Sequence, residues 1–68
     1  MKTINVTVEC KCAEKELKGF ESNWTRIIRY RKKYDGTYVV DLECKVDDSI
    51  DRSLVLKMFN EGQGYYAY

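Results

Sequence analysis

Apolar and polar residues alternate without a break over residues 3–12, where TINVTVECKC places an apolar side chain at every even position. A period of two is typical of a β-strand with one face in a core and the other in water. Cys10 and Cys12 continue the apolar row that begins at Ile4. The pattern therefore predicts that both cysteines point into the core as small, reduced thiols.

Three shorter elements follow this strand. Residues 13–20, AEKELKGF, are mostly helix formers that last barely two turns before Gly19, so we expect a short helix or turn there. Two further strands are expected over residues 24–33 and 37–46, where β-branched and aromatic residues are frequent.

The turn between these two strands sets their register. A two-residue loop at Asp35 and Gly36 would place three cations on the face of the apolar row that follows, which a sheet with one buried face disfavours. A three-residue loop over residues 34–36, closed by Gly36 in the left-handed conformation, keeps both faces consistent. The cross-strand pairs that this register predicts are Tyr30 with Val40, Ile28 with Leu42, Trp24 with Val46 and Arg29 with Asp41.

A helix is expected over residues 50–61, capped by Asp48 or Ser49 and ended by Gly62. Its apolar residues cover roughly half of the circumference at about 100° per residue, and Leu56 lies beyond that arc. A stripe of this width is normally covered on a second side. The tail over residues 62–68 could supply this cover as a lid, add a short edge strand, remain flexible or contact another chain.

Together these elements predict a single α+β domain over residues 1–68, with a three-stranded antiparallel sheet and the C-terminal helix packed on one face. We expect the strand order 1-2-3. The alternative places the first strand beside the third, because the eleven residues from Ala13 to Asn23 can carry the chain across the sheet. A domain of this size buries only about 60% of the surface of its unfolded chain, so its core is small.

The composition, 44% hydrophobic and 34% charged with no proline, is that of a folded globular protein. Twelve basic and eleven acidic residues give a net charge of +1, so any attraction to nucleic acid must be local. The sequence has no apolar run near the ~20 residues of a membrane span and does not begin like a signal peptide. We therefore expect a mature cytoplasmic protein that does not bind membranes.

The residues that usually carry catalysis are few. Three cysteines without any histidine fall short of a structural zinc site, and an odd count does not suit a disulfide framework. A metal shared with a second chain, or a redox role, is the alternative for the cysteines. The acidic residues Asp47, Asp48 and Asp51 are interpreted as helix caps. The sequence predicts no enzymatic activity, no cofactor and no metal site.

The wide apolar helix and the aromatic tail favour a small protein that binds another protein, as a regulator or inhibitor of the kind that viral or mobile-element genomes encode. A homodimer through the same helix face is one form of this hypothesis. The expected interaction residues are Leu56, Phe59, Tyr65, Tyr66 and Tyr68.

The alternative hypothesis is a nucleic-acid-binding domain that uses the basic second strand. The unit from Trp24 to Glu61 is similar in outline to the DNA-binding heads of some integrases and plant transcription factors, but no motif of those families is present, so no residue role is carried over. The register places Trp24 and Tyr30 inward, which leaves few aromatic side chains to stack on bases. Cations on an edge strand also prevent aggregation. The candidate residues are Arg29, Arg31, Lys32, Lys33 and Tyr34.

Overall fold

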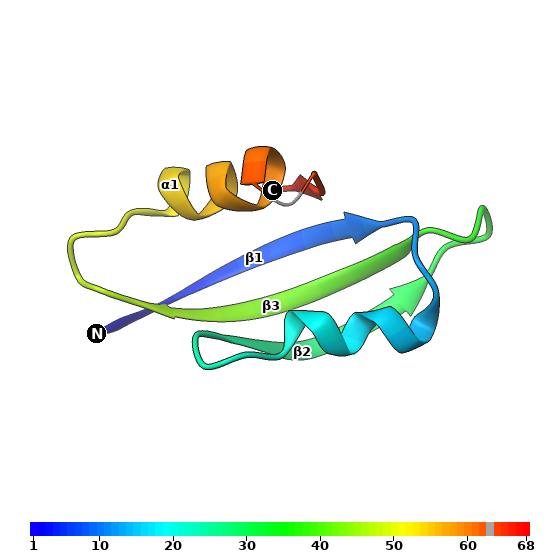
Figure 1. Ribbon diagram of the computed structural model, residues 1–68, viewed down its shortest axis with the longest axis horizontal. Helices are drawn as coiled ribbons and strands as arrows, with labels where there is room; N and C mark the ends of the chain where they lie inside the picture. The colour runs from blue at the N-terminus through cyan, green and yellow to red at the C-terminus, as the bar shows by residue number, and fades with distance from the viewer. Residues whose placement is uncertain (63) are drawn as a thin grey trace.

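The computed structural model describes residues 1–62 and 64–68, and it shows a layer of antiparallel strands with helical segments packed on one face (Figure 1). The predicted α+β fold is confirmed, with a short fourth strand added to the sheet. In chain order the elements are β1 (Lys2–Cys10), the 3₁₀ helix η1 (Glu14–Phe20), β2 (Thr25–Lys32), β3 (Tyr38–Val46), α1 (Arg52–Lys57), the π-helical turn η2 (Met58–Gly62) and β4 (Tyr66–Ala67).

The strands lie in the order β2-β3-β1-β4, so the expected order 1-2-3 is wrong and the alternative, with β1 beside β3, is correct. β1 and β3 pair in register over nine positions, from Lys2 opposite Val46 to Cys10 opposite Tyr38. Both strands carry long apolar rows, and burying these rows requires a neighbour on each side. β2, whose side chains are mostly exposed, takes the sheet edge instead.

The hairpin between β2 and β3 has the predicted three-residue loop. The Lys33 amide donates to the Thr37 carbonyl at 2.7 Å, and Gly36 has a φ of 90°, in the left-handed region that glycine favours. The predicted pairs of Tyr30 with Val40 and Arg29 with Asp41 are confirmed.

A β-bulge then shifts the register between Ile27 and Arg29, so the other two predicted pairs are wrong. Ile27, not Ile28, lies opposite Leu42, and Trp24 precedes β2 instead of pairing with Val46. The bulge occurs where two isoleucines follow one another, so either could occupy the buried position.

The core lies between one face of the sheet and the helical segments. Leu17 and Phe20 of η1, Val55 of α1 and Phe59 of η2 all join one buried cluster with the even-numbered residues of β1 and β3. The Trp24 and Phe59 rings stack at 5.7 Å between centroids, which links the start of β2 to the C-terminal helix. Because the buried residues of the helical segments all belong to this cluster, the opposite face of the sheet is left open to solvent.

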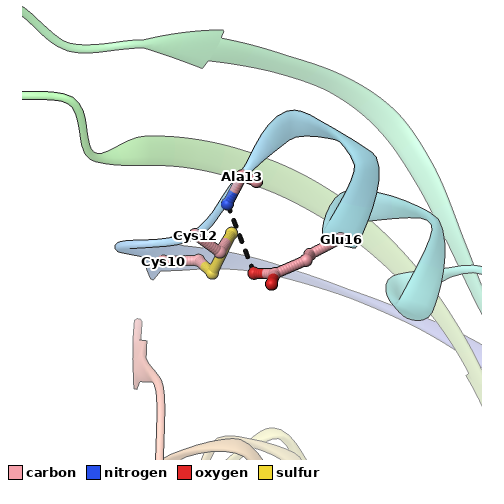
Figure 2. The surroundings of a disulfide bond; sticks show 4 residues. All are labelled: Cys10, Cys12, Ala13 and Glu16. Carbon is pink, nitrogen blue, oxygen red and sulfur yellow. Dashed lines mark hydrogen bonds between the residues drawn. A yellow bond between two sulfur atoms is a disulfide. The ribbon is translucent and has the colours of Figure 1, made fainter.

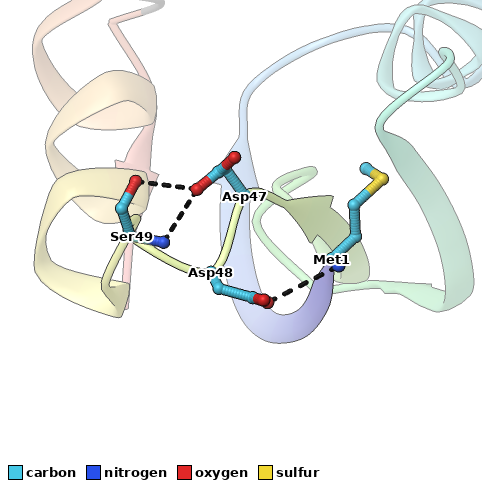
Figure 3. A network of polar contacts seen from close by, with 4 residues as sticks. All are labelled: Met1, Asp47, Asp48 and Ser49. Carbon is cyan, nitrogen blue, oxygen red and sulfur yellow. Dashed lines mark hydrogen bonds and ion pairs between the residues drawn. The ribbon is translucent and has the colours of Figure 1, made fainter.

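The C-terminal helix begins later than expected. Its N-cap is Asp51, whose side chain accepts a hydrogen bond from the Leu54 amide at 2.9 Å, so the expected cap at Asp48 or Ser49 is wrong. Asp47 instead accepts hydrogen bonds from the amide and hydroxyl of Ser49 at 2.9 and 2.8 Å, which folds the preceding turn (Figure 3). These bonds lower the pKa of the Asp47 carboxyl.

Cys10 and Cys12 form a disulfide, so the prediction of two reduced core thiols is wrong for this pair (Figure 2). The alternation that placed both side chains in one apolar row ends with β1 at Cys10. The chain turns at Cys12, and the two Cα atoms lie 5.4 Å apart. Cys44 is a free, buried thiol, and burial raises its pKa to about 11.

The C-terminal tail adds the short edge strand that was one of its expected forms, although its residue 63 lies outside the described residues. Tyr68 exchanges two backbone hydrogen bonds of 2.8 Å with Thr7 of β1. On the other side, the Asn60 amide group donates to the Ala67 carbonyl at 3.2 Å and accepts from the Ala67 amide at 2.8 Å. Asn60 thus holds β4 against β1.

Candidate binding surface

The face of the sheet opposite the helical segments is the main candidate site, and we call it the open face. Strand alternation and pairing place on it the odd-numbered residues of β1 and β3, the arginines of β2, Lys33 just beyond β2, and two tyrosines of the tail. The charged and aromatic members of the open face are Glu9, Arg26, Arg29, Arg31, Lys33, Asp41, Glu43, Lys45, Tyr66 and Tyr68.

Tyr66 and Tyr68 reach the open face because β4 alternates like any strand. Ala67 lies opposite Val8 and is buried in the core, so its two neighbours point the other way. The two tyrosine rings lie 5.4 Å apart and are 65% and 45% exposed. Two adjacent aromatic rings are therefore presented to solvent on a strand that is fixed from both sides.

Ion pairs join the strands across the open face. Asp41 accepts a hydrogen bond from Arg29 Nε at 2.6 Å and another from the Thr7 hydroxyl at 2.9 Å. These two bonds lower the pKa of the Asp41 carboxyl. Arg26 pairs with Glu43, and Lys33 pairs with Glu9, each at 3.2 Å. The hydrogen bond from Lys33 to Glu9 raises the pKa of the lysine.

A hollow lies between the arginines of β2 and Tyr68. Val39, only 6% exposed, is among its lining residues, together with Arg31, Asp41 and Tyr68. The pKa of the Tyr68 hydroxyl is raised mainly by partial burial and, to a smaller extent, by a hydrogen bond with Glu9. Among the described residues, Arg31 has no carboxylate within ion-pair distance. The hollow therefore presents a free guanidinium beside an aromatic ring.

The open face carries a small excess of positive charge. Five cations, three of them arginines, stand against three carboxylates, which gives a net charge of +2. Each of the three carboxylates already has a cation within 3.2 Å. An acidic ligand would therefore meet positive charge at Arg31 and Lys45 without having to displace an existing ion pair.

The structure divides the predicted nucleic-acid residues between two faces. Arg29, Arg31 and Lys33 lie on the open face, whereas the Lys32 ammonium lies 5.8 Å from the centroid of the Tyr38 ring, on the side of the core. Tyr34 is fully exposed at the tip of the hairpin. The tyrosines that do join the cations are Tyr66 and Tyr68, which the sequence had not placed on this face.

The predicted protein-interaction residues are separated in a similar way. Phe59 is 5% exposed and belongs to the core, so it cannot contact a partner in this conformation. Leu56 is half-buried, and Tyr65 packs against Phe20 with 4.9 Å between ring centroids. Tyr66 and Tyr68 lie across the sheet from the helix. Phe59 and Tyr65 line one hollow, but Tyr66 and Tyr68 are on the other face, so the five predicted residues do not form one surface.

Three residues that shape the candidate surfaces were not identified from the sequence pattern. Leu54 and Met58 are the exposed apolar residues of the C-terminal helix, at 42% and 44%. Ile28, 48% exposed, borders a second hollow with Thr7, Arg29 and Asp41 because of the bulge in β2. Two consecutive isoleucines were the one signal of that bulge.

The described residues contain no group of three or more histidine, cysteine, aspartate or glutamate side chains placed to hold a metal ion. Within the same part of the chain, no helix is both long and apolar enough to cross a membrane. Comparison with known proteins finds no family model, no curated protein and no solved structure that matches this chain.

Proposed function

We propose that this protein is a small, non-enzymatic regulator or inhibitor that binds another protein through the open face of its sheet. The observation that carries the proposal is a hollow lined by Tyr68 and by Arg31, which has no carboxylate partner among the described residues, with the exposed ring of Tyr66 5.4 Å from that of Tyr68. Tyrosine and arginine are the residues most often found at binding hot spots, along with tryptophan. The interaction residues are Tyr66 and Tyr68, as expected from the sequence, joined by Arg29 and Arg31.

The surrounding structure favours high-affinity binding at this surface. Tyrosine presents a large contact area with few rotatable bonds, so little conformational entropy is lost on binding. Both tyrosines stand on backbone that is already ordered by hydrogen bonds to Thr7 and Asn60. A preorganised surface of this kind reduces the entropic cost of association.

The charge of the open face favours a partner with an acidic patch. The open face has a net charge of +2, and its own carboxylates are already ion-paired. Arg31 can therefore attract a carboxylate of the partner, while the ion pairs form a polar rim around the contact. Two copies of this face would bring charges of the same sign together. We therefore propose a foreign protein partner in place of a homodimer.

The non-enzymatic part of the proposal rests on the side chains themselves. The chain has no histidine, the three carboxylates of the open face are each bound by a cation, and the Cys44 thiol is buried with a raised pKa. None of these groups is free to act as a base or nucleophile near neutral pH. We also propose that the protein acts in the cytoplasm, where the disulfides that do occur are usually transient and redox-active.

A photo-crosslinking amino acid at Tyr66 tests the proposal directly, and matched positions at Leu54 and Tyr34 serve as controls. All three side chains are exposed, on the open face, the helix and the hairpin tip respectively. In cells of the native host, we expect the cross-linker at position 66 to capture one protein. This cross-link should disappear when Arg31→Ala is added. Cross-links from Leu54 alone would contradict the open face and favour the helix.

Nucleic acid is the second candidate ligand, because Arg29 and Arg31 share the open face with two exposed tyrosines. Base stacking on aromatic side chains beside cations is a common mode of single-strand binding. This hypothesis predicts that log affinity for an oligothymidylate falls linearly with log salt, with a slope of about 0.7 per phosphate contacted. The absence of salt-dependent binding, or binding that survives the change of both arginines to serine, would exclude it.

A further inference from the structure

The disulfide between Cys10 and Cys12 spans a single residue, Lys11, at the end of β1 (Figure 2). A disulfide stabilises a fold mainly by restricting the unfolded chain, and this effect increases with the length of the closed loop. Here the cysteines are two positions apart, so the loop is among the shortest that a disulfide can close. Stabilisation of the fold therefore does not account well for this bond.

The two cysteines also differ in burial. Cys10 is 5% exposed and belongs to the core cluster, opposite Tyr38. Cys12 is half-buried and lies in the turn that leads to η1. A small thiol approaching from solvent can therefore reach the sulfur of Cys12 more readily than that of Cys10.

Cys44 provides an internal contrast. Its side chain is fully buried in the middle of β3, and desolvation raises the pKa of its thiol to about 11. Because the thiolate is the form that attacks a disulfide, a buried thiol of this kind is inert near neutral pH. Thiol chemistry in this chain is thus confined to the pair at the end of β1.

We propose that Cys10 and Cys12 form a thiol–disulfide exchange site for low-molecular-weight thiols. A thiolate attacks Cys12 Sγ, the bond between the two cysteines breaks, and Cys10 leaves as a thiolate that takes up a proton. A second thiolate attacks the sulfur of the first molecule, forms a small-molecule disulfide and releases the Cys12 thiolate, which is also protonated. Two thiols are oxidised to one disulfide, and the protein disulfide is reduced to two thiols.

The disulfide lies where β1 leads into η1, beside the open face. The residue before Cys10 is Glu9, which holds the Lys33 ammonium and lies opposite Tyr66. The residue after Cys12 is Ala13, whose amide donates to Glu16 Oε2 at 3.2 Å at the start of η1 (Figure 2). The disulfide therefore lies at the junction between β1 and η1, next to a residue of the open face.

The test is a titration of the folded, full-length protein with glutathione at a series of reduced-to-oxidised ratios. Acid quenching, alkylation and peptide mass spectrometry then report each cysteine separately. We expect Cys10 and Cys12 to become alkylated together, to return to the disulfide in oxidised glutathione, and to do so with an unchanged far-UV circular dichroism spectrum. Cys44 should stay unmodified, and Cys44→Ser should give the same titration.

Three results would overturn the proposal. Alkylation of Cys10 and Cys12 at every ratio would mean that the disulfide does not form. A bond that resists excess reduced glutathione until urea unfolds the chain would mean that the site is closed to exchange. Loss of the circular dichroism spectrum on reduction would mean that the disulfide serves to hold the fold together.

Discussion

Replacing Asn60 by alanine should release β4 from the domain. The Asn60 side chain, which is exposed, makes two hydrogen bonds to the backbone of the buried Ala67, at 3.2 and 2.8 Å. Each such bond contributes about 0.5–1.5 kcal/mol net, so Asn60→Ala should lower the free energy of unfolding by about 1–3 kcal/mol. For a domain of this size each kcal/mol corresponds to roughly 4–8 °C in the melting temperature.

Two measurements separate local release from global unfolding. Thermal denaturation followed by circular dichroism reports the whole domain, whereas amide hydrogen exchange at Tyr68 reports β4, because that amide donates to the Thr7 carbonyl. We expect faster exchange at Tyr68 together with the lower melting temperature. The control is Asn23→Ala, since Asn23 is exposed and its side chain makes no hydrogen bond to the described residues.

The variant Asn60→Asp adds a pH signature. When protonated, the new carboxyl can keep both bonds, donating to the Ala67 carbonyl and accepting from the Ala67 amide. When ionised, it keeps only the second bond and turns a charge toward the carbonyl oxygen, so we expect its pKa to be raised. The stability relative to the parent is then retained below the unfolded value of about 3.9 and lost as the pH rises through the folded pKa. Equal stability of Asn60→Ala and the parent, with unchanged exchange at Tyr68, would refute the assigned role of Asn60.

Three further predictions concern the stability of the fold. Gly36→Ala should lower the free energy of unfolding, measured by chemical denaturation, by about 1–2 kcal/mol. The cost comes from the φ of 90° alone, because no atom lies within 4 Å of the added methyl group, and Gly19→Ala, without a positive φ, should cost nothing. Phe59→Ala should cost about 3–5 kcal/mol in the same assay and leave little folded protein at 37 °C, whereas Leu54→Ala, at 42% exposure, should stay within about 0.5 kcal/mol. Asp41→Asn should flatten the acid side of the plot of stability against pH. The lowered pKa of the Asp41 carboxyl adds stability above the unfolded value of about 4, and this stability is lost as the pH falls through the lowered pKa of the folded state. An exposed ion pair of this kind is worth about 0.2–1 kcal/mol.

Patterns that depend on near neighbours in the chain were predicted correctly. The alternation over residues 3–12 located β1, and the position of Gly36 selected the three-residue loop and the Arg29–Asp41 pair. These features follow from the pleat of a strand and from the conformations that glycine allows. Neither depends on what lies across the sheet.

Features that depend on distant parts of the chain were missed. The place of β1 between β3 and β4 is decided by packing on both sides of it, and a two-residue strand such as β4 has no periodicity to detect. The helix start was ambiguous because four polar residues that can cap a helix occur between Asp47 and Asp51. The disulfide depends on how the chain turns after Cys10, which strand alternation cannot describe.

The position of the tyrosine pair on the open face depends on contacts made on the opposite face of the sheet. A two-residue strand is too short to hold itself, so β4 relies on burial of Ala67 and on its bonds to Asn60. Asn60→Ala should therefore weaken binding to the cross-linked partner although Asn60 is not on the open face. Tyr68→Ala should weaken binding while leaving exchange at the Ala67 amide nearly unchanged. If Asn60→Ala frees β4 but binding persists, the tyrosines are not the contact, and the interface must lie at the β2 side of the face, around Arg29 and Arg31.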